Sequence, residues 1–446
     1  MKEKIISLLN ENTMNVSELK SLLPEMNTVD IAEIFQELDR IKILRLFRIL
    51  PKNMASEVFA YVDSDQQEQI VEVLTDTEIG EIMSELFVDD AVAFIEEMPA
   101  NVVNRVLKNI NPEKRRTINQ ILQYPEDSAG SMMTTEYISL KENSTVEEAF
   151  DAIRETGLNK ETIYTCYVTS WDRVLKGVVT AKALFLAESD EKIANIMEVN
   201  PVFVHTTDDR EAAAALFQRY GFLAMPVVDR EERLVGIITV DDIVDVIVEE
   251  TTEDIEKMAA LTPSDESYMK TGVFKQSKNR ILWLMFLMLS ATITGTIISS
   301  YENSLLVLPI LVSFIPMLMN TAGNAGSQSS VLMVRGLALG EVSFDDIFIV
   351  LWREIRVALL CGIALAAVNF IRIYIMHGRD LLLCLTISVS LIATVIMAKT
   401  VGCVLPLFAK KLRIDPAIMA APLITTIADA ASLIVYFSLA SLILRI

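Results

Sequence analysis

The chain has 446 residues, 52% of them hydrophobic, and a formal net charge of −21. This length predicts two to four domains and excludes a single soluble domain. The first 275 residues carry 27 Lys and Arg against 52 Asp and Glu, whereas the remainder is slightly basic. So acidic a segment repels phosphates and attracts cations, which argues against nucleic-acid binding and makes metal binding a hypothesis. A merely soluble acidic surface is the alternative.

The first 130 residues show the pattern of short helices with periodic apolar positions, for example Ile70, Val73 and Leu74. Leu50-Pro51-x-Asn53 recurs as Met98-Pro99-x-Asn101, and the intervening units resemble helix-turn pieces of about 24 residues. The pattern predicts a small N-terminal α-solenoid over residues 1–130.

Two later segments repeat each other. Val168, Gly177 and Thr180 are matched 59 residues later by Val227, Gly236 and Thr239, and each copy predicts strand, turn, strand and helix. The repeat resembles a tandem pair of α/β cystathionine-β-synthase (CBS) domains, over 131–190 and 191–245.

Many CBS pairs bind adenine nucleotides through a T-x-x-D element. Thr239 and Asp242 match this element in the second copy, whereas Ala183 replaces the acid in the first. The resemblance therefore implies ATP or another adenine nucleotide as a ligand, with a purely structural dimerisation module as the alternative.

An acidic helix follows. Asp242, Asp245, Glu249, Glu253 and Glu256 lie along one stripe of it, and eight acids precede the first base, Lys257. Such crowding of like charges is destabilising unless solvent, bases or cations screen it. We expect a connecting helix and linker over 246–275 with a regulatory cation site, against the alternative of a solvated acidic face.

The last 171 residues, 276–446, contain apolar stretches long enough to cross a bilayer of about 30 Å. They predict a five-helix, all-α transmembrane domain with spans at Ile281–Ser300, Leu305–Val334, Ile347–Met376, Leu381–Ala409 and Pro416–Leu444. Lysines and arginines at 275–280 and 410–413 place these loops in the cytoplasm. We expect a multi-pass protein of the cytoplasmic membrane with its N-terminus cytoplasmic and its C-terminus external. A symmetric homodimer with a pore at its axis is plausible on five helices per chain.

The fifth predicted span carries Asp429 near its middle, with Thr425 one turn earlier on the same face. An ionised Asp at this depth costs about 2.5 to 3.5 kcal/mol on insertion scales, so it usually faces water or a partner. We interpret Asp429 as a cation ligand in a pore. A structural hydrogen bond to a neighbouring helix is the alternative.

The second predicted span is unusually small and polar. Pro316 frees a carbonyl one turn earlier, Gly323 allows close backbone approach, and Asn320, Asn324 and Gln328 recur every four residues on one face. Oxygen ligands without thiols or histidines suit a hard cation such as Mg²⁺. A small-residue seam for helix packing is the alternative.

With these parts in order, the chain resembles the MgtE family of magnesium channels. Further matches are Tyr124-Pro-Glu-Asp-Ser-Ala-Gly130, Gly323-Asn324-x-Gly326-x-Gln328, and Asp415-Pro416 followed by Asp429. The resemblance implies a homodimer that passes Mg²⁺ down its gradient and closes when cytosolic Mg²⁺ bridges acids of the N domain, the CBS pair and the connecting helix.

Carried over by position, the regulatory metal ligands are acids in three regions: Asp89 and Asp90 in the N domain, Asp209 and Glu211 in the CBS pair, and Asp242, Asp245, Glu250, Glu253 and Asp254 in the connecting helix. Three pore positions depart from the family. Ala421 stands where relatives have Asn, and Asn320 and Ala322 stand where they often have Asp and Gly. Selectivity among divalent ions therefore stays open.

Two other readings remain. One keeps the fold but transports Co²⁺ or couples Mg²⁺ efflux to Na⁺, and the other is a membrane-tethered CBS nucleotide sensor with an inert pore. We expect no enzyme activity, because no nucleophile-base pair or Walker sequence is present and His205 and His377 are isolated.

Overall fold

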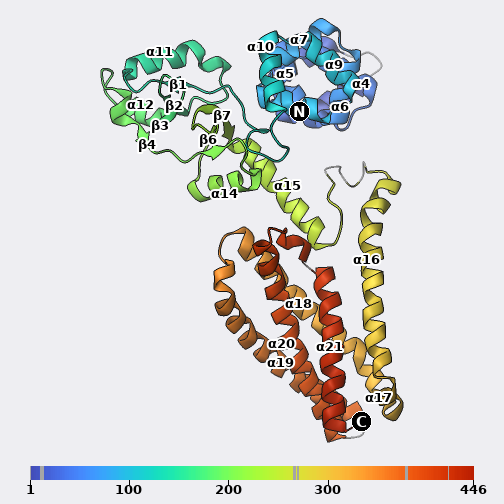
Figure 1. Cartoon of the computed structure of the whole chain (residues 1–446). Coiled ribbons are helices and arrows are strands. Elements are labelled where there is room, and N and C mark those ends of the chain that lie inside the picture. Colours follow the sequence, from blue (N-terminus) through green and yellow to red (C-terminus); the bar gives the residue numbers. More distant parts are fainter. Residues whose placement is uncertain are drawn as a thin grey trace. The chain divides into compact units, whose positions relative to one another are not determined.

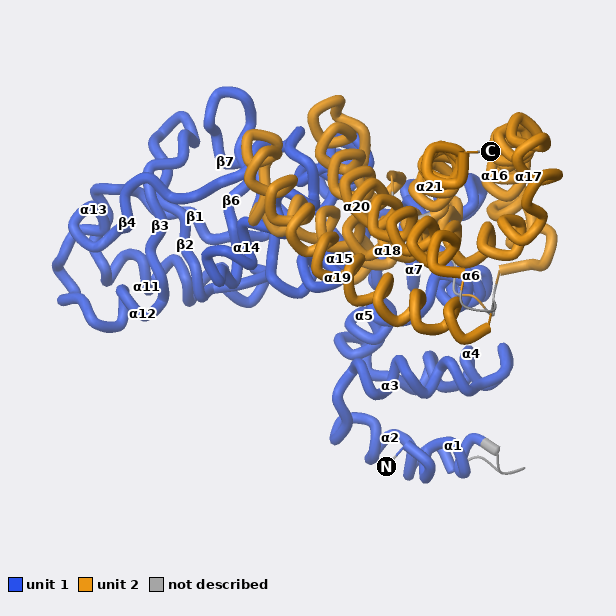
Figure 2. Tube along the Cα trace, turned by 90° about the horizontal axis from the view of Figure 1, so that it is seen from below, with its two compact units in different colours: residues 1–247 blue, residues 248–446 orange. Residues whose placement is uncertain are grey.

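The computed structural model describes residues 2–10, 15–264, 268, 271–376, 380–419 and 421–445. The chain forms two compact units, Met1–Ile247 and Val248–Ile446, coloured blue and orange in Figure 2. The boundary falls inside one helix, α15 (Val240–Met258).

The first unit begins with a helical solenoid, and Figure 1 shows its helices arranged in a ring. After α1 (Lys2–Asn10), α2 (Val16–Leu22), a 3₁₀ turn (Leu23–Glu25) and α3 (Thr28–Phe35), ten-residue helices start every 12 residues. These are α4 (Arg40–Ile49), α5 (Lys52–Tyr61), α6 (Ser64–Val73), α7 (Asp76–Glu85), α8 (Val88–Glu97), α9 (Ala100–Asn109) and α10 (Pro112–Ile121). Two such helices make a 24-residue unit, so the predicted solenoid is confirmed.

The regular repeat has a local cause. Polar side chains cap several helices: Asp39 accepts a hydrogen bond from the Lys42 amide, and Thr75 and Glu78 form a capping box. Inside, Phe35, Phe47, Phe59 and Phe94 make successive edge-on ring contacts with centroids 6.4, 6.3 and 5.1 Å apart. The first three of these rings recur at the 12-residue spacing and hold consecutive helices together.

The CBS pair follows as two small sheets. In the first, β1 (Ser139–Leu140) pairs parallel with β2 (Thr165–Thr169), which pairs antiparallel with β3 (Leu175–Thr180) and through it with β4 (Glu198–Val199). In the second, β5 (Val204–His205) pairs parallel with β6 (Ala224–Val228), and β6 pairs antiparallel with β7 (Leu234–Thr239). The helices of the pair are α11 (Val146–Thr156), a 3₁₀ turn (Gly157–Asn159), α12 (Ala181–Leu186), α13 (Ile193–Ile196) and α14 (Arg210–Tyr220).

The two copies show the predicted repeat in their strand register. Val168 faces Gly177 in the first sheet, and Val227 faces Gly236 in the second. The copies also join reciprocally: the Leu175 amide donates to the Glu232 carbonyl and the Leu234 amide to the Arg173 carbonyl. The backbone therefore forms a pseudo-symmetric module.

The second unit contains the apolar helices. In the described residues, four segments are long and apolar enough to cross a membrane: Val273–Ser300 (α16), Phe344–Met376, Leu381–Lys411 (α20) and Pro416–Leu444. A 3₁₀ turn (Phe344–Asp346) precedes α19 (Ile347–Met376), and another (Pro416–Met419) precedes α21 (Ala421–Leu444). These segments correspond to the first, third, fourth and fifth predicted spans.

The second predicted span, Leu305–Val334, does not form one continuous helix. Instead α17 (Glu302–Val307) and a 3₁₀ segment (Pro309–Phe314) precede α18 (Ile315–Ala338). Pro309 has no amide hydrogen and interrupts the helix there. Pro316 lies in the first turn of α18, where a missing amide is harmless, so it begins a helix rather than breaking one.

Candidate functional site

The polar helix α18 packs closely against α21. A Cβ atom built on Gly323 would lie 3.0 Å from Thr425 Cγ2 and 3.9 Å from Asp429 Oδ1. The two predicted pathway residues of α21 therefore share the side that faces α18, and a side chain at position 323 would press against Thr425. The Asp429 carboxylate is half-buried at this contact.

A second side of α18 is polar and exposed. Asn320, Asn324 and Gln328 are all exposed in the single chain, and the Asn324 amide donates to Asn320 Oδ1 at 3.3 Å. Lipid cannot satisfy such amides. Ala421 is the first residue of α21, and its side chain lies outside the described residues.

The acids of the first unit meet where the solenoid contacts the CBS pair. Asp89 and Asp90 begin α8, Asp242 lies in the first turn of α15, and Glu161 lies between the 3₁₀ turn and β2. The Glu161 amide donates to the Glu136 carbonyl at 2.9 Å, which fixes Glu161 beside the other acids. We call Asp89, Asp90, Glu161, Asp241 and Asp242 the interface acids.

The interface acids repel one another strongly. Burial, with repulsion from Asp90, raises the pKa of Glu161 to about 8. Burial also raises the pKa of Asp242 to about 7 and that of Asp90 to about 6, and with repulsion from Asp242 it raises the pKa of Asp89 well above its usual range. At neutral pH some of these carboxyl groups are therefore protonated, and the ionised ones repel one another.

One lysine lies among these acids. Lys114 Nζ donates a hydrogen bond to the Leu86 carbonyl, and burial lowers the pKa of Lys114 although Glu136, Asp89 and Asp90 oppose this shift. A single ammonium group cannot balance five carboxylates.

The interface acids suit a cation in one further respect. Glu161 Oε2 is buried and has no hydrogen-bond partner among the described residues. A buried carboxylate oxygen of this kind is costly unless it is protonated or meets a cation. No three His, Cys, Asp or Glu side chains of the described residues converge on one point as direct ligands.

The C-terminal half of α15 carries a second group. Lys257 Nζ lies 2.7 Å from Glu253 Oε1 and 2.7 Å from Asp415 Oδ2, so it joins the connecting helix to the segment before α21. Burial, with repulsion from Asp415, raises the pKa of the neighbouring Asp254, and Glu250 adds to this repulsion. We call Glu250, Glu253, Asp254, Lys257 and Asp415 the α15 end group. Glu253, predicted as a metal ligand, already has an ammonium partner.

The remaining predicted ligands have local surroundings. Asp209 caps α14 and accepts a hydrogen bond from the Glu211 amide at 2.8 Å, while its backbone bridges to Ser128. Asp245 lies on α15 one turn after Asp242. Among the described residues, the hydrogen bonds and ion pairs given for Asp209 join it neither to the interface acids nor to the α15 end group.

The predicted nucleotide element has a defined geometry. Thr239, buried at the end of β7, donates from Oγ1 to Asp242 Oδ2 at 2.8 Å. Because Asp242 also belongs to the interface acids, one carboxylate serves both the predicted nucleotide element and the predicted metal site.

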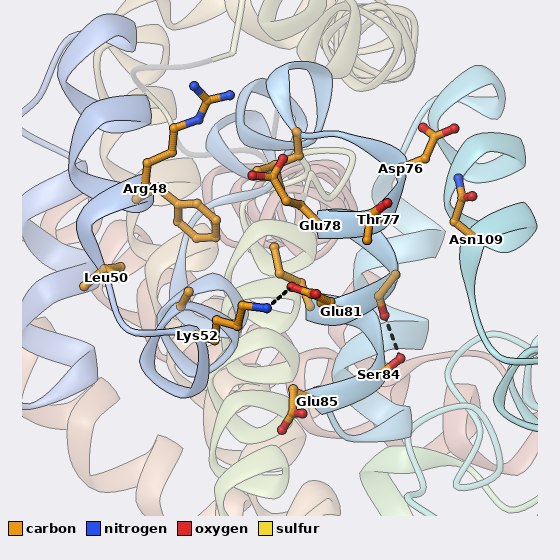
Figure 3. A pocket seen from close by; sticks show the side chains of 15 residues that line it. Arg48, Leu50, Lys52, Asp76, Thr77, Glu78, Glu81, Ser84, Glu85 and Asn109 are labelled. Atoms are coloured by element: carbon orange, nitrogen blue, oxygen red, sulfur yellow. Dashed lines mark hydrogen bonds and ion pairs between the residues drawn. The ribbon is translucent and has the colours of Figure 1, made fainter.

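A pocket of about 830 Å³ lies away from these acids, in the solenoid between α5 and α7. Figure 3 shows Lys52 pointing at Glu81, and their ion pair is 2.6 Å long. Ser84 donates to the Gly80 carbonyl at 2.6 Å. The Lys52–Glu81 ion pair and the Ser84 hydrogen bond therefore stay within the solenoid.

Several residues of these groups were missed from the sequence. Glu161 and Lys114 follow no periodic pattern, and only the folded contact between solenoid and CBS pair brings them to Asp89 and Asp242. The Asp415-Pro416 motif does not indicate by itself that Asp415 pairs with Lys257. Glu354 and Lys399, charges inside the predicted third and fourth spans, were the available signal for a further buried group.

Comparisons with known proteins agree with this organisation. Three family models match: the MgtE intracellular N domain over residues 26–127, the CBS domain over 129–190 and 193–249, and MgtE, described as a divalent cation transporter, over 315–439. The chain is 34% identical to the magnesium transporter MgtE of Thermus thermophilus, covering 100% of both chains. It is 31% identical to that of Bacillus subtilis, covering 98% of this chain and 96% of the relative.

Solved structures resemble the soluble part. The cytosolic domain of the Mg²⁺ channel MgtE in complex with ATP is 33% identical, with a TM-score of 0.52, and the match covers 55% of this chain and all of that one. The soluble part of a magnesium transporter is 29% identical, with a TM-score of 0.53, over 56% of this chain and 99% of the other. The chain belongs to the MgtE family of divalent cation transporters.

Proposed function

We propose that this chain is a homodimeric Mg²⁺ channel that mediates Mg²⁺ uptake and closes when cytosolic Mg²⁺ binds the interface acids. The single observation that carries the proposal is the position of the intramembrane Asp429, whose Oδ1 would lie 3.9 Å from a Cβ atom built on Gly323 of the polar helix α18. An acid at membrane depth beside a seam of small and amide residues supports passage of a hydrated hard cation. The names of the full-length relatives point to Mg²⁺ as that cation.

The exposed amides of α18 support a dimer. Asn320, Asn324 and Gln328 lie on the surface of the single chain at membrane depth, where water or a partner must satisfy them. A second copy related by a two-fold axis brings the same amides and a second Asp429 to a shared pathway. The basic loops at 275–280 and 410–413 support a cytoplasmic N-terminus and an external C-terminus.

Closure has a physical basis in the interface acids. Mg²⁺ between the solenoid and the CBS pair offsets repulsion that otherwise opposes their contact, and only the form that holds these acids together gains this binding energy. Moving the closed population from 1% to 99% requires about 5.5 kcal/mol of differential binding. Several ions of modest affinity supply this amount, and the α15 end group offers a second place for them.

The test of the pore is Mg²⁺ flux into liposomes that contain the purified full chain. Asp429→Ala should abolish flux, and Asp429→Glu should retain part of it, because the longer side chain still presents a carboxylate. Thr386→Val is the matched control, since Thr386 is buried in α20 and donates only to the Leu382 carbonyl of its own helix. Saturable Mg²⁺ uptake by folded Asp429→Ala protein contradicts the proposal. Parallel assays with Co²⁺, Ca²⁺ and Na⁺ measure selectivity.

A second ligand is favoured by the Thr239–Asp242 hydrogen bond and by the ATP complex of the related cytosolic domain. We infer that an adenine nucleotide binds the second CBS copy and competes with Mg²⁺ for Asp242. ATP titration of the full chain at low and high Mg²⁺ tests this. Asp242→Asn should weaken both ligands, whereas ATP affinity that is the same at all Mg²⁺ concentrations contradicts competition.

A further inference from the structure

The membrane unit contains a buried ion pair that the proposed pore does not use. Glu354 of α19 and Lys399 of α20 are only 8% and 6% exposed, and the Lys399 ammonium lies 3.7 Å from Glu354 Oε2. Ser329 of α18 is fully buried between them. Its hydroxyl donates to Glu354 Oε2 at 2.7 Å and accepts from Lys399 Nζ at 3.1 Å. The three groups form one network across three helices.

Charges are expensive at this depth. An ionised side chain inside a membrane is rare and usually pairs with another group or lies beside water. An apolar pair would pack these helices without that cost, and replacing buried ion pairs by apolar residues is often neutral or stabilising. Packing alone therefore does not explain a charged pair here. The charges add an orienting effect, because the carboxylate and the ammonium both bind the Ser329 hydroxyl and so fix its orientation.

The network lies next to the ion pathway. Ser329 follows Gln328 directly and lies about 9 Å along α18 from Gly323, at 1.5 Å per residue. A Cβ atom on Gly326 would lie 2.8 Å from Ile424 Cγ2 of α21 and 3.2 Å from the Ala398 carbonyl of α20. The adjacent Ser330 donates to the Met419 carbonyl at 3.4 Å, just before α21. This part of α18 thus touches both α20 and the start of α21.

We propose that Glu354 and Lys399 are positioning residues, which hold α18 through Ser329 so that Gln328 and Asn324 face the ion pathway. This inference rests on the proposed pore. A rotation of α18 about its axis carries Ser329 away from both charges and moves the amides together with it, because all these side chains extend from one rigid helix. The network therefore sets which oxygen atoms a passing ion meets, and with them the preference among divalent cations.

The experiment measures Mg²⁺, Ca²⁺ and Co²⁺ flux in liposomes containing the full chain, and compares the ratios of these fluxes rather than their sizes. Glu354→Gln and Lys399→Met should each change the Mg²⁺ to Ca²⁺ ratio by about tenfold, the size expected for loss of a charge-assisted hydrogen bond. Ser329→Ala should change it in the same direction but less. Thr386→Val should leave it unchanged, since its hydroxyl bonds only within α20.

The single variants leave one charge unpaired, so the double variant Glu354→Gln with Lys399→Met provides a second measurement on protein that folds. It removes both charges together, and we expect a ratio that differs from wild type but less than in the singles. The inference is overturned if the folded single variants keep the wild-type Mg²⁺ to Ca²⁺ flux ratio. If the single variants do not fold, a wild-type ratio in the double variant overturns it. Wild-type protein that carries none of these ions overturns the proposed function instead.

Discussion

The two units place buried carboxylates in opposite situations. In the first, among the residues that the structure describes, Glu161 Oε2 has no hydrogen-bond partner and Lys114 lies among the interface acids. In the second, Glu354 has both Lys399 and Ser329 within the bundle. A buried carboxylate that pairs with a lysine and a hydroxyl of the same bundle stabilises one packing arrangement, because no further ion needs to bind it. A cluster of carboxylates that lacks such partners responds to ions, because each bound cation or proton relieves the repulsion between them.

The largest expected effect comes from breaking the paired group. Lys399→Met or Glu354→Gln alone should lower the stability of the full chain by about 3 to 5 kcal/mol, since each leaves a buried partner unpaired. The double variant should recover most of this loss. Thermal unfolding of purified protein in detergent measures it, with Thr386→Val as the control. A double variant as unstable as the sum of the singles would show that the charges do not act as a pair.

Removing an unpaired acid should have the opposite sign. Glu161→Gln takes away charge that the fold does not compensate, so Mg²⁺-free protein should gain about 1 to 2 kcal/mol after allowance for solvent screening. Addition of Mg²⁺ should then stabilise the variant less than wild type. Glu147→Gln, on the exposed start of α11, is the matched control. A destabilised variant in Mg²⁺-free buffer argues that Glu161 has a structural partner.

The same acids predict a pH dependence. The folded pKa of Glu161 is raised to about 8 and that of Asp242 to about 7, above the unfolded values of about 4. The folded form therefore binds more protons, and Mg²⁺-free stability should be complete below about pH 4 and be lost as the pH rises through 7 to 8. Apparent unfolding temperatures at several pH values measure this effect. Saturating Mg²⁺ should flatten the profile, and an equally steep profile with Mg²⁺ contradicts the account.

A smaller effect is expected at the α15 end group. Lys257→Met removes the ammonium group that binds both Glu253 and Asp415, so these two carboxylates lose that shared partner. Closure should then need less Mg²⁺, by a factor of about two to five, the range of partly exposed ion pairs. The Mg²⁺ concentration that halves flux measures this shift, and Lys20→Met on the exposed side of α2 is the control. A requirement for more Mg²⁺ would mean that Lys257 itself holds the closed form.

Repetition made much of the fold predictable. The recurrence of Leu50-Pro51-x-Asn53 as Met98-Pro99-x-Asn101 and the 59-residue offset between Gly177 and Gly236 are repeats visible in the sequence, and each predicts a packing unit. The polar face of Asn320, Asn324 and Gln328 was equally visible. Hydropathy alone did not show where the second span divides, because it stays high across Pro309, where the backbone forms a 3₁₀ segment instead of an α-helix.

The charge partners were not predictable in the same way. Glu161 and Asp89 are far apart in sequence and become neighbours only when the solenoid folds against the CBS pair. Glu354 and Lys399 lie in long, largely apolar segments, and hydropathy averages their charges away. Identifying such pairs requires the three-dimensional contacts, because no periodicity relates their positions.

The most direct test of the account is Mg²⁺ flux through the full chain in liposomes, with Mg²⁺ on the side of residues 1–247 raised stepwise. Wild-type flux should fall as this Mg²⁺ rises. The double variant Glu161→Gln with Asp242→Asn should stay open at concentrations that close the wild type, because it lacks two of the interface acids. Mg²⁺ flux that ignores sensor-side Mg²⁺, or a double variant that closes like wild type, would contradict regulation by the interface acids.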